Sequence, residues 1–199
     1  MTEQEKVLQF WFGGLKEGEQ VPAERFDLWF GGAAATDRQI RDCFSTVVDR
    51  AGNGDFDSWS ATPRGTLALL ILLDQFPRNI FRGSSRAYAY DGKACDFCLR
   101  GLATGQQREL ITVERAFFYL PLEHAEDMVL QRQSVAAFAD LLRQAPGALK
   151  ETCLGFFDYA ERHRAIIERF GRFPHRNAAL ARPSTEAEKI FLREPGSSF

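Results

Sequence analysis

The 199-residue sequence lacks the features that identify several large classes of protein. Its longest aliphatic run, LALLILL, has seven residues, whereas a membrane-spanning helix needs about 20. A basic segment followed by an apolar one is missing at its beginning, so no secretory signal is visible and we expect a cytoplasmic protein. The net charge of -2 shows no excess of basic residues, so we expect neither nucleic acid nor a membrane as a partner.

Motifs for cofactors and metals are also missing. The sequence contains no P-loop, no G-x-G-x-x-G and no G-x-S-x-G. We expect its three histidines to be isolated from one another, and no H-E-x-x-H pattern occurs. The four cysteines are expected to be reduced thiols, and the lone C-x-x-C of Cys95 and Cys98 has no second pair to complete a zinc site. We therefore expect no cofactor and no metal.

The composition is that of an ordinary globular protein, with 45% hydrophobic and 26% charged residues. Eighteen phenylalanines predict a thick aromatic core between helices. Apolar residues recur at helical spacing nearly throughout, and no segment alternates convincingly as a strand does. The sequence therefore predicts one all-α domain over residues 1–199, with about eight helices joined by short loops.

Capping residues indicate where several helices begin. A threonine followed three residues later by Glu or Gln is a capping box, and such pairs precede three of the predicted helices: Thr2 with Glu5, Thr36 with Gln39, and Thr185 with Glu188. Pro63 fits the first turn of an apolar and therefore central helix. Another helix is expected over about 85–99.

The second half of the chain predicts three longer helices. Thr112 is expected to cap the first, which Pro121 should break or kink. The second is expected over about 122–143. The third begins at Pro146 and ends at Gly171, with one apolar stripe that includes His163.

Two similar polar segments each follow a stretch that is predicted to be helical. They are LDQFPRNIFR at 73–82 and GRFPHRNAAL at 171–180. Asp74 comes directly after the aliphatic run, so we expect it to be buried and paired, with Arg78 or Arg82 as the nearest partner. Asn79 is expected to bond exposed backbone at the helix end.

A third polar segment, PLEHAED, carries the candidate acid–base residues. Glu123 and Asp127 are four residues apart and are expected on one helix face. Neighbouring carboxylates would raise the pKa of His124 and orient its ring. His124, Glu123 and Asp127 are therefore the candidate catalytic residues, and a hydrogen-bonded bridge to a neighbouring helix is the structural alternative for His124.

The acidic and arginine-rich segments have complementary charges, so we predict that DQFPRN, PLEHAED and GRFPHRN converge in space. Residues 161–182 hold six Arg and two Glu. The candidate ligand-binding residues are Asp74, Gln75, Arg78, Asn79, Arg82, Arg172, His175, Arg176 and Asn177.

Three interpretations of these clusters stay open. The first is a binding module whose arginines hold an anionic small molecule or a peptide carboxylate. The second is an enzyme in which His124 acts with Glu123 or Asp127 and the arginines form an electrostatic clamp. The third is a salt-bridge network that only joins helix ends.

The three polar segments, together with VLQFWFG and RFDLWF near the beginning of the chain, resemble a bacterial family known as domain of unknown function 924. The resemblance covers essentially the whole chain. It implies a tetratricopeptide-like α-α superhelix without a regular repeat, and it implies no activity.

Overall fold

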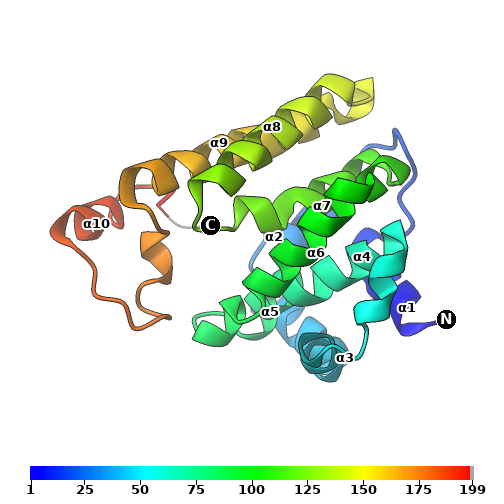
Figure 1. Ribbon diagram of the computed structural model, residues 1–199, viewed down its shortest axis with the longest axis horizontal. Helices are drawn as coiled ribbons and strands as arrows, with labels where there is room; N and C mark the ends of the chain where they lie inside the picture. The colour runs from blue at the N-terminus through cyan, green and yellow to red at the C-terminus, as the bar shows by residue number, and fades with distance from the viewer. Residues whose placement is uncertain (198–199) are drawn as a thin grey trace.

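The computed structural model describes residues 1–197 as an all-α protein (Figure 1). The α-helices are α1 (Glu3–Phe12), α2 (Ala23–Phe30), α3 (Ala34–Asn53), α4 (Pro63–Leu70), α5 (Phe76–Ile80), α6 (Asp91–Thr104), α7 (Thr112–Glu123), α8 (Met128–Gln144), α9 (Lys150–Phe170) and α10 (Glu186–Phe191). The shorter helical segments are η1 (Asp57–Ala61), η2 (Ile71–Gln75), η3 (Ser85–Tyr88), η4 (Gln106–Glu109), η5 (Gly147–Leu149) and η6 (Pro174–Arg176). None of the described residues forms a strand, and none of the described helices combines the length and apolar character needed to cross a membrane.

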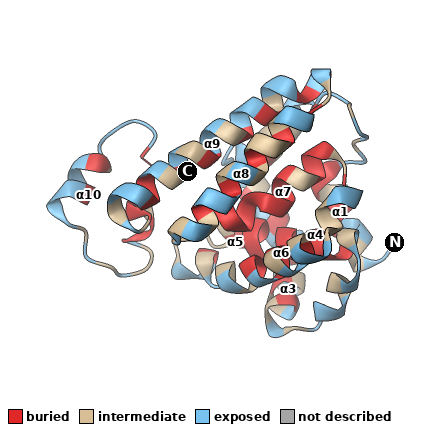
Figure 2. Ribbon diagram, turned by 45° about the horizontal axis from the view of Figure 1, so that its top comes forward, coloured by how far each residue is buried: buried red, intermediate tan, exposed pale blue. Residues whose placement is uncertain are grey.

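Helices α4 and α7 lie at the centre of the fold. α4 contacts α1, α6 and α7, and every residue from Gly65 to Leu73 is buried. α8 and α9 form an antiparallel hairpin that packs on α7, and their outward faces are largely exposed (Figure 2). α10 lies at one end of the molecule, beyond the end of α9 (Figure 1). The expected all-α architecture is confirmed, while the tetratricopeptide-like superhelix stays a prediction.

Several predicted helix ends are confirmed because they depend on local interactions. Thr2 and Thr185 both form complete capping boxes. Pro63 is the first residue of α4, and Thr62 accepts a hydrogen bond from the backbone N–H of Gly65. α9 ends at Phe170, and the predicted Gly171 follows as its C-cap with a φ of +70°. A left-handed backbone favours glycine, because glycine has no Cβ to clash there.

Several predicted helix starts or caps are wrong. α3 begins at Ala34 without a side-chain cap, because the alanines before Thr36 favour helix and extend it backwards. The predicted helix over 85–99 is split into η3 and α6. α7 begins at Thr112, but this residue does not cap it: its backbone N–H and hydroxyl both donate to the Glu17 carboxylate.

The helix predicted over 122–143 begins later than expected. Pro121 lies inside α7, which continues to Glu123, and α8 begins only at Met128. Asp127 is the N-cap of α8, where its side chain accepts hydrogen bonds from the backbone N–H groups of Val129 and Leu130. Asp127 and Glu123 therefore do not share a helix face.

The first Phe-Pro motif does not follow a helix end. α4, η2 and α5 form one helical run, and η2 is a π-turn in which the backbone N–H of Phe76 donates to the carbonyl of Ile71. The wider turn accommodates Pro77, which has no N–H to donate. The second motif, at Phe173 and Pro174, does come directly after the end of α9.

Candidate functional site

Three polar segments that are far apart in the sequence meet at one place in the fold. Asp74 lies in η2, His124 directly follows α7, and Arg176 is the last residue of η6. His124 Nδ1 lies 2.8 Å from Asp74 Oδ1, and Arg176 Nη2 donates a 3.0 Å hydrogen bond to the backbone carbonyl of His124. The predicted convergence of DQFPRN, PLEHAED and GRFPHRN is confirmed.

The Asp74 carboxylate is only 1% exposed and has three side-chain partners. Arg78 Nη1 lies 3.2 Å from Oδ1, and Gln75 Nε2 donates to Oδ2 at 2.5 Å. Burial would raise the pKa of Asp74, but the charge of Arg78 and the hydrogen bonds from His124 and Gln75 outweigh it and hold this pKa below its ordinary value. Because Asp74 is ionised, Nδ1 of His124 carries the shared proton and Nε2 keeps its lone pair.

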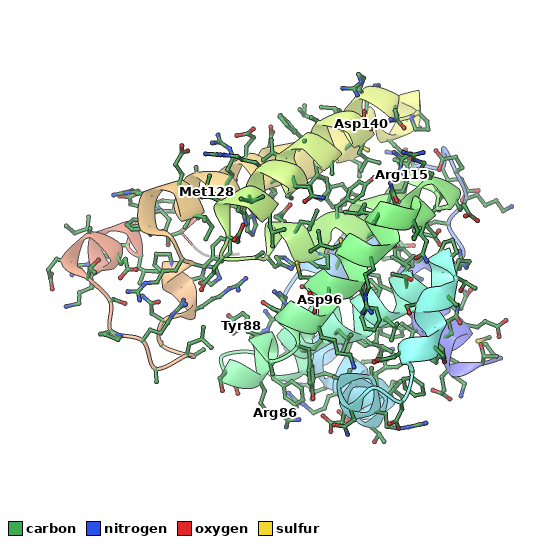
Figure 3. All side chains as sticks on the ribbon, viewed as in Figure 1. Arg86, Tyr88, Asp96, Arg115, Met128 and Asp140 are labelled. Carbon is green, nitrogen blue, oxygen red and sulfur yellow. The ribbon has the colours of Figure 1, made fainter. Side chains whose placement is uncertain are left out.

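Asp91, the first residue of α6, connects Arg78 with the buried Arg176. Arg78 donates two hydrogen bonds to its carboxylate, at 2.9 and 3.0 Å, and Arg176 donates a third at 3.2 Å. The guanidinium of Arg176 also lies 4.7 Å from the ring centre of Tyr88. Figure 3 shows Tyr88 between α6 and the C-terminal segment. The two carboxylates of this cluster, Asp74 and Asp91, balance its two guanidiniums.

Glu123 and His163 form a second buried pair beside this cluster. Both are 3% exposed, and His163 Nδ1 lies 3.2 Å from Glu123 Oε1. Burial, together with the nearby charge of Asp74, raises the pKa of Glu123 well above its ordinary value. Burial lowers the pKa of His163 well below its ordinary value, and that of His124 to a smaller extent.

The histidines are not isolated from one another in the folded structure, so that expectation is wrong. The rings of His124 and His163 lie 6.0 Å apart. Glu123, His124 and His163 each offer one donor atom, and these three atoms lie within 4.8 Å of one another. His175 is close to the same group, and burial, with Arg176 and Arg78 nearby, lowers its pKa to about 4.

Arg82 and Asn79 belong to a different polar group. Arg82 donates two hydrogen bonds to Asp37 of α3, at 2.8 and 2.9 Å, and Asn79 Nδ2 donates a third at 3.0 Å. Of the two candidate partners predicted for Asp74, Arg78 is therefore confirmed and Arg82 is not, and the predicted role of Asn79 at exposed backbone is wrong. Both residues instead join α5 and its flanking turn to α3.

Arg172 and Asn177 hold the C-terminal segment. Arg172 donates to both oxygens of Glu188 in α10, at 2.7 and 2.9 Å. Asn177 Nδ2 donates to the hydroxyl of Ser184, and Asn177 Oδ1 accepts from Arg182. Of the predicted ligand-binding residues, the structure thus brings Asp74, Gln75, Arg78, His175 and Arg176 together, and it places Asn79, Arg82, Arg172 and Asn177 in other contacts.

The bond between Arg172 and Glu188 leads to a prediction about acid stability. This bond is the main cause that lowers the pKa of Glu188 to about 2. Because the folded pKa is depressed, the stabilisation is complete above the ordinary value of 4.5 and is lost as pH falls towards 2. We expect the difference in free energy of unfolding between wild type and Glu188→Gln to shrink over this range.

Denaturant titrations from about pH 2 to pH 6 measure this difference. Arg172→Met is the matched variant, because it removes the partner of Glu188 and should show the same pH dependence. When both substitutions are combined, the two effects should not add. A difference that stays constant down to pH 2 would contradict the assignment.

An apolar pocket of about 470 Å³ lies between α2, α7 and α9. It is lined by Gln20, Val21, Phe26, Phe30, Leu120, Glu123, Ala148, Glu151, Thr152, Gly155, Phe156 and Tyr159. Two of these residues are acidic and none is Lys or Arg. Glu123 therefore belongs both to the pocket wall and to the buried histidine group.

Sequence reasoning missed several members of this site. Tyr88 precedes α6 and Asp91 begins it, but nothing in the sequence connects these two residues to Arg78 and Arg176. His163 was predicted only as part of the apolar stripe of α9, and its burial agrees with that position. The two cysteines of the C-x-x-C motif are free and buried, as expected for core residues.

The fold and the site define an all-α protein with a buried polar cluster next to an apolar pocket. The family described as "Bacterial protein of unknown function (DUF924)" matches residues 7–196, and the chain belongs to this family. The solved structure of the protein of unknown function ATU0120 from Agrobacterium tumefaciens is similar over 95% of this chain and 96% of its own, with 34% identity and a TM-score of 0.80. The comparison with curated proteins found no match.

Proposed function

We propose that the protein binds a small amphipathic molecule in the pocket between α2, α7 and α9. The observation that carries this proposal is the position of Glu123, whose buried carboxyl group lies in the wall of a mostly apolar pocket. A volume of about 470 Å³ is within the range of small-molecule sites, about 300–1,000 Å³. A few polar groups in an apolar wall are also typical of such sites.

The lining residues favour a ligand with an apolar body and a polar end that donates hydrogen bonds. Phe26, Phe30, Phe156 and Tyr159 supply aromatic surface for the apolar body. Glu123 and Glu151 are acceptors for a hydroxyl or ammonium group, and an ammonium group would also be attracted to the aromatic rings. A carboxylate end would find no basic side chain among the lining residues.

Gly155 keeps part of this pocket open. It lies inside α9, where glycine costs about 1 kcal/mol relative to alanine. A Cβ placed on Gly155 would meet no atom within 4 Å. A larger side chain is therefore tolerated by the backbone and would occupy the pocket or its opening.

This geometry gives a direct test of ligand binding. Straight-chain alcohols and alkylammonium ions should raise the thermal unfolding midpoint of the wild type, by an amount equivalent to about 2.7 kcal/mol at 100 times the dissociation constant. Alkyl carboxylates of the same length should not raise it.

Two glycine variants test whether the ligand binds in this pocket. Gly155→Leu should abolish the shift. Gly92→Leu should preserve it, because Gly92 is an exposed helical glycine outside the pocket whose Cβ would also meet no atom within 4 Å. Equal shifts in both variants would exclude the pocket as the binding site.

The anionic ligand predicted from the sequence is a second candidate, favoured by one observation. Arg176 Nε is buried and donates no hydrogen bond among the described residues. The terminal guanidinium nitrogens of Arg78 and Arg176 donate to the backbone carbonyl of Asp74, the carboxylate of Asp91 and the backbone carbonyl of His124. Stabilisation by phosphate or citrate that Arg176→Gln removes and Gly155→Leu leaves intact would favour this candidate.

The enzymatic alternative involves other residues than those predicted from the sequence. Asp127 is exposed and caps α8, so the carboxylate that orients His124 is Asp74. A neutral His124 with a lone pair on Nε2 is the form that accepts a proton in general base catalysis. A reaction of this kind would need a substrate whose reacting atom reaches His124, which is 14% exposed.

A further inference from the structure

We propose that Glu123, His124 and His163 bind one divalent first-row transition metal ion, such as Zn²⁺. The three side chains come from the end of α7 and from α9, and one donor atom of each lies within 4.8 Å of the other two. Two imidazoles and one carboxylate form a ligand set found in zinc enzymes. The inference shares Glu123 with the proposed pocket, but it does not depend on ligand binding there.

A hydrogen bond at the far side of the His124 ring supports the proposal. His124 Nδ1 lies 2.8 Å from the Asp74 carboxylate, whereas His163 Nδ1 lies 2.9 Å from the backbone carbonyl of Tyr159 and also faces the site, 3.2 Å from Glu123 Oε1. Histidines that bind metals almost always donate their second ring N–H to a carboxylate or a backbone carbonyl, which fixes the ring and directs the other nitrogen to the ion. With Nδ1 of His124 held by Asp74, Nε2 is the nitrogen of this ring that would bind the metal.

The charges of the site also favour a cation at this position. Asp74 and Asp91 are balanced by Arg78 and Arg176. Among the described residues, no Lys or Arg forms an ion pair with Glu123, whose partner is His163. A buried carboxylate is stable only when it is paired, and a metal ion would supply the missing positive charge.

This arrangement gives Asp74 a specific role. A carboxylate in the middle of an apolar helical run is expensive to bury, and the π-turn η2 places it against His124. Asp74 would act as a positioning residue for the metal, through His124. π-turns occur frequently at functional sites, in agreement with this role.

Three protein ligands leave at least one coordination position for water or a ligand, as in catalytic rather than structural zinc sites. Glu123 also lines the apolar pocket, so a molecule bound there would lie next to the ion. The thiols are not part of the set: Cys95 and Cys98 are buried, and Cys98 Sγ donates to the backbone carbonyl of Phe118.

The test is metal binding by the full-length protein after dialysis against a chelator. A titration with Zn²⁺, monitored by isothermal titration calorimetry, should show one tightly bound equivalent per chain. Co²⁺ should bind at the same site with visible d–d absorption and without the charge-transfer band of a thiolate ligand. Weak, non-stoichiometric binding, or a thiolate band from the bound equivalent, would overturn the proposal.

Matched variants assign the ligands. Glu123→Gln and His163→Gln should each weaken binding by more than the 10–100-fold that loss of an outer partner costs, and Asp74→Asn by about 10–100-fold. His175→Gln removes a nearby histidine outside the ligand set and should leave the affinity unchanged. Circular dichroism confirms that each variant is folded. Full affinity in folded Glu123→Gln, or an equal loss in His175→Gln, would contradict the assignment.

Discussion

We expect Asp74→Ala to lower the free energy of unfolding by about 3–5 kcal/mol, measured by denaturant titration in the presence of a chelator. The Asp74 carboxylate is 1% exposed and is bonded to Arg78, Gln75 and His124. Its removal leaves the buried donors of these side chains without their acceptor. The chelator ensures that metal binding does not contribute to the difference.

Asp49→Ala is the control for this prediction. Asp49 also forms an ion pair with an arginine, Arg86, but both side chains are at least half exposed. Exposed pairs contribute about 0–1 kcal/mol, because water solvates the freed charge. If Asp49→Ala and Asp74→Ala lower the free energy of unfolding by the same amount, burial of the Asp74 cluster is not what stabilises the fold.

Phe117→Ala should have an effect of similar size, about 3–5 kcal/mol. Phe117 lies in α7 and is 1% exposed. Its ring contacts the rings of Trp11, Phe12, Trp29, Phe30 and Phe156, at centroid distances from 4.7 to 6.2 Å. The substitution removes a side chain that joins α1, α2 and α9 and leaves a cavity between them.

Phe30→Ala provides the matched comparison, because Phe30 contacts the same cluster but is 55% exposed. Full burial of a phenylalanine contributes about 1.5–3 kcal/mol, so a half-exposed ring should contribute about half of this. Thermal and denaturant unfolding of the two variants measure the difference. A cost for Phe117→Ala no larger than that for Phe30→Ala would contradict the proposed central position of Phe117.

The two predictions concern adjacent parts of one structure. Phe117 and Glu123 both belong to α7, which carries the aromatic core on one stretch and the polar site at its end. Phe30 and Phe156 contact Phe117 and also line the pocket. The core therefore fixes the position of the helix end that presents Glu123 and His124.

Local features of the fold were predictable from the sequence where a hydrogen bond joins residues close together in the chain. The capping boxes at Thr2 and Thr185, and the end of α9 at Gly171, are confirmed for this reason. The start at Thr36 was wrong because the helix propensity of the preceding alanines competes with the cap. The break after Pro121 was misplaced because a proline inside a helix removes one hydrogen bond, whereas Asp127 provides two at the next helix start.

The site was only partly predictable. Burial of Asp74 followed from the apolar run before it, and convergence of the segments followed from their opposite charges. The choice between partners did not follow: Arg82 and Arg78 are both close to Asp74 in sequence, yet Arg82 faces Asp37 of α3. That choice depends on which helix packs on each side of α5.

The all-α class, the helix ends with complete capping boxes, the burial of Asp74 and the family all follow from the sequence. Periodicity, capping and the cost of burying an unpaired charge act over a few residues, so they can be read from the chain. Packing of the helices brings Glu123, His124 and His163 together, links the two arginines through Asp91 and forms a pocket beside Glu123. These features depend on how α2, α6, α7 and α9 pack through their aromatic side chains, and this packing joins residues that no spacing in the sequence connects.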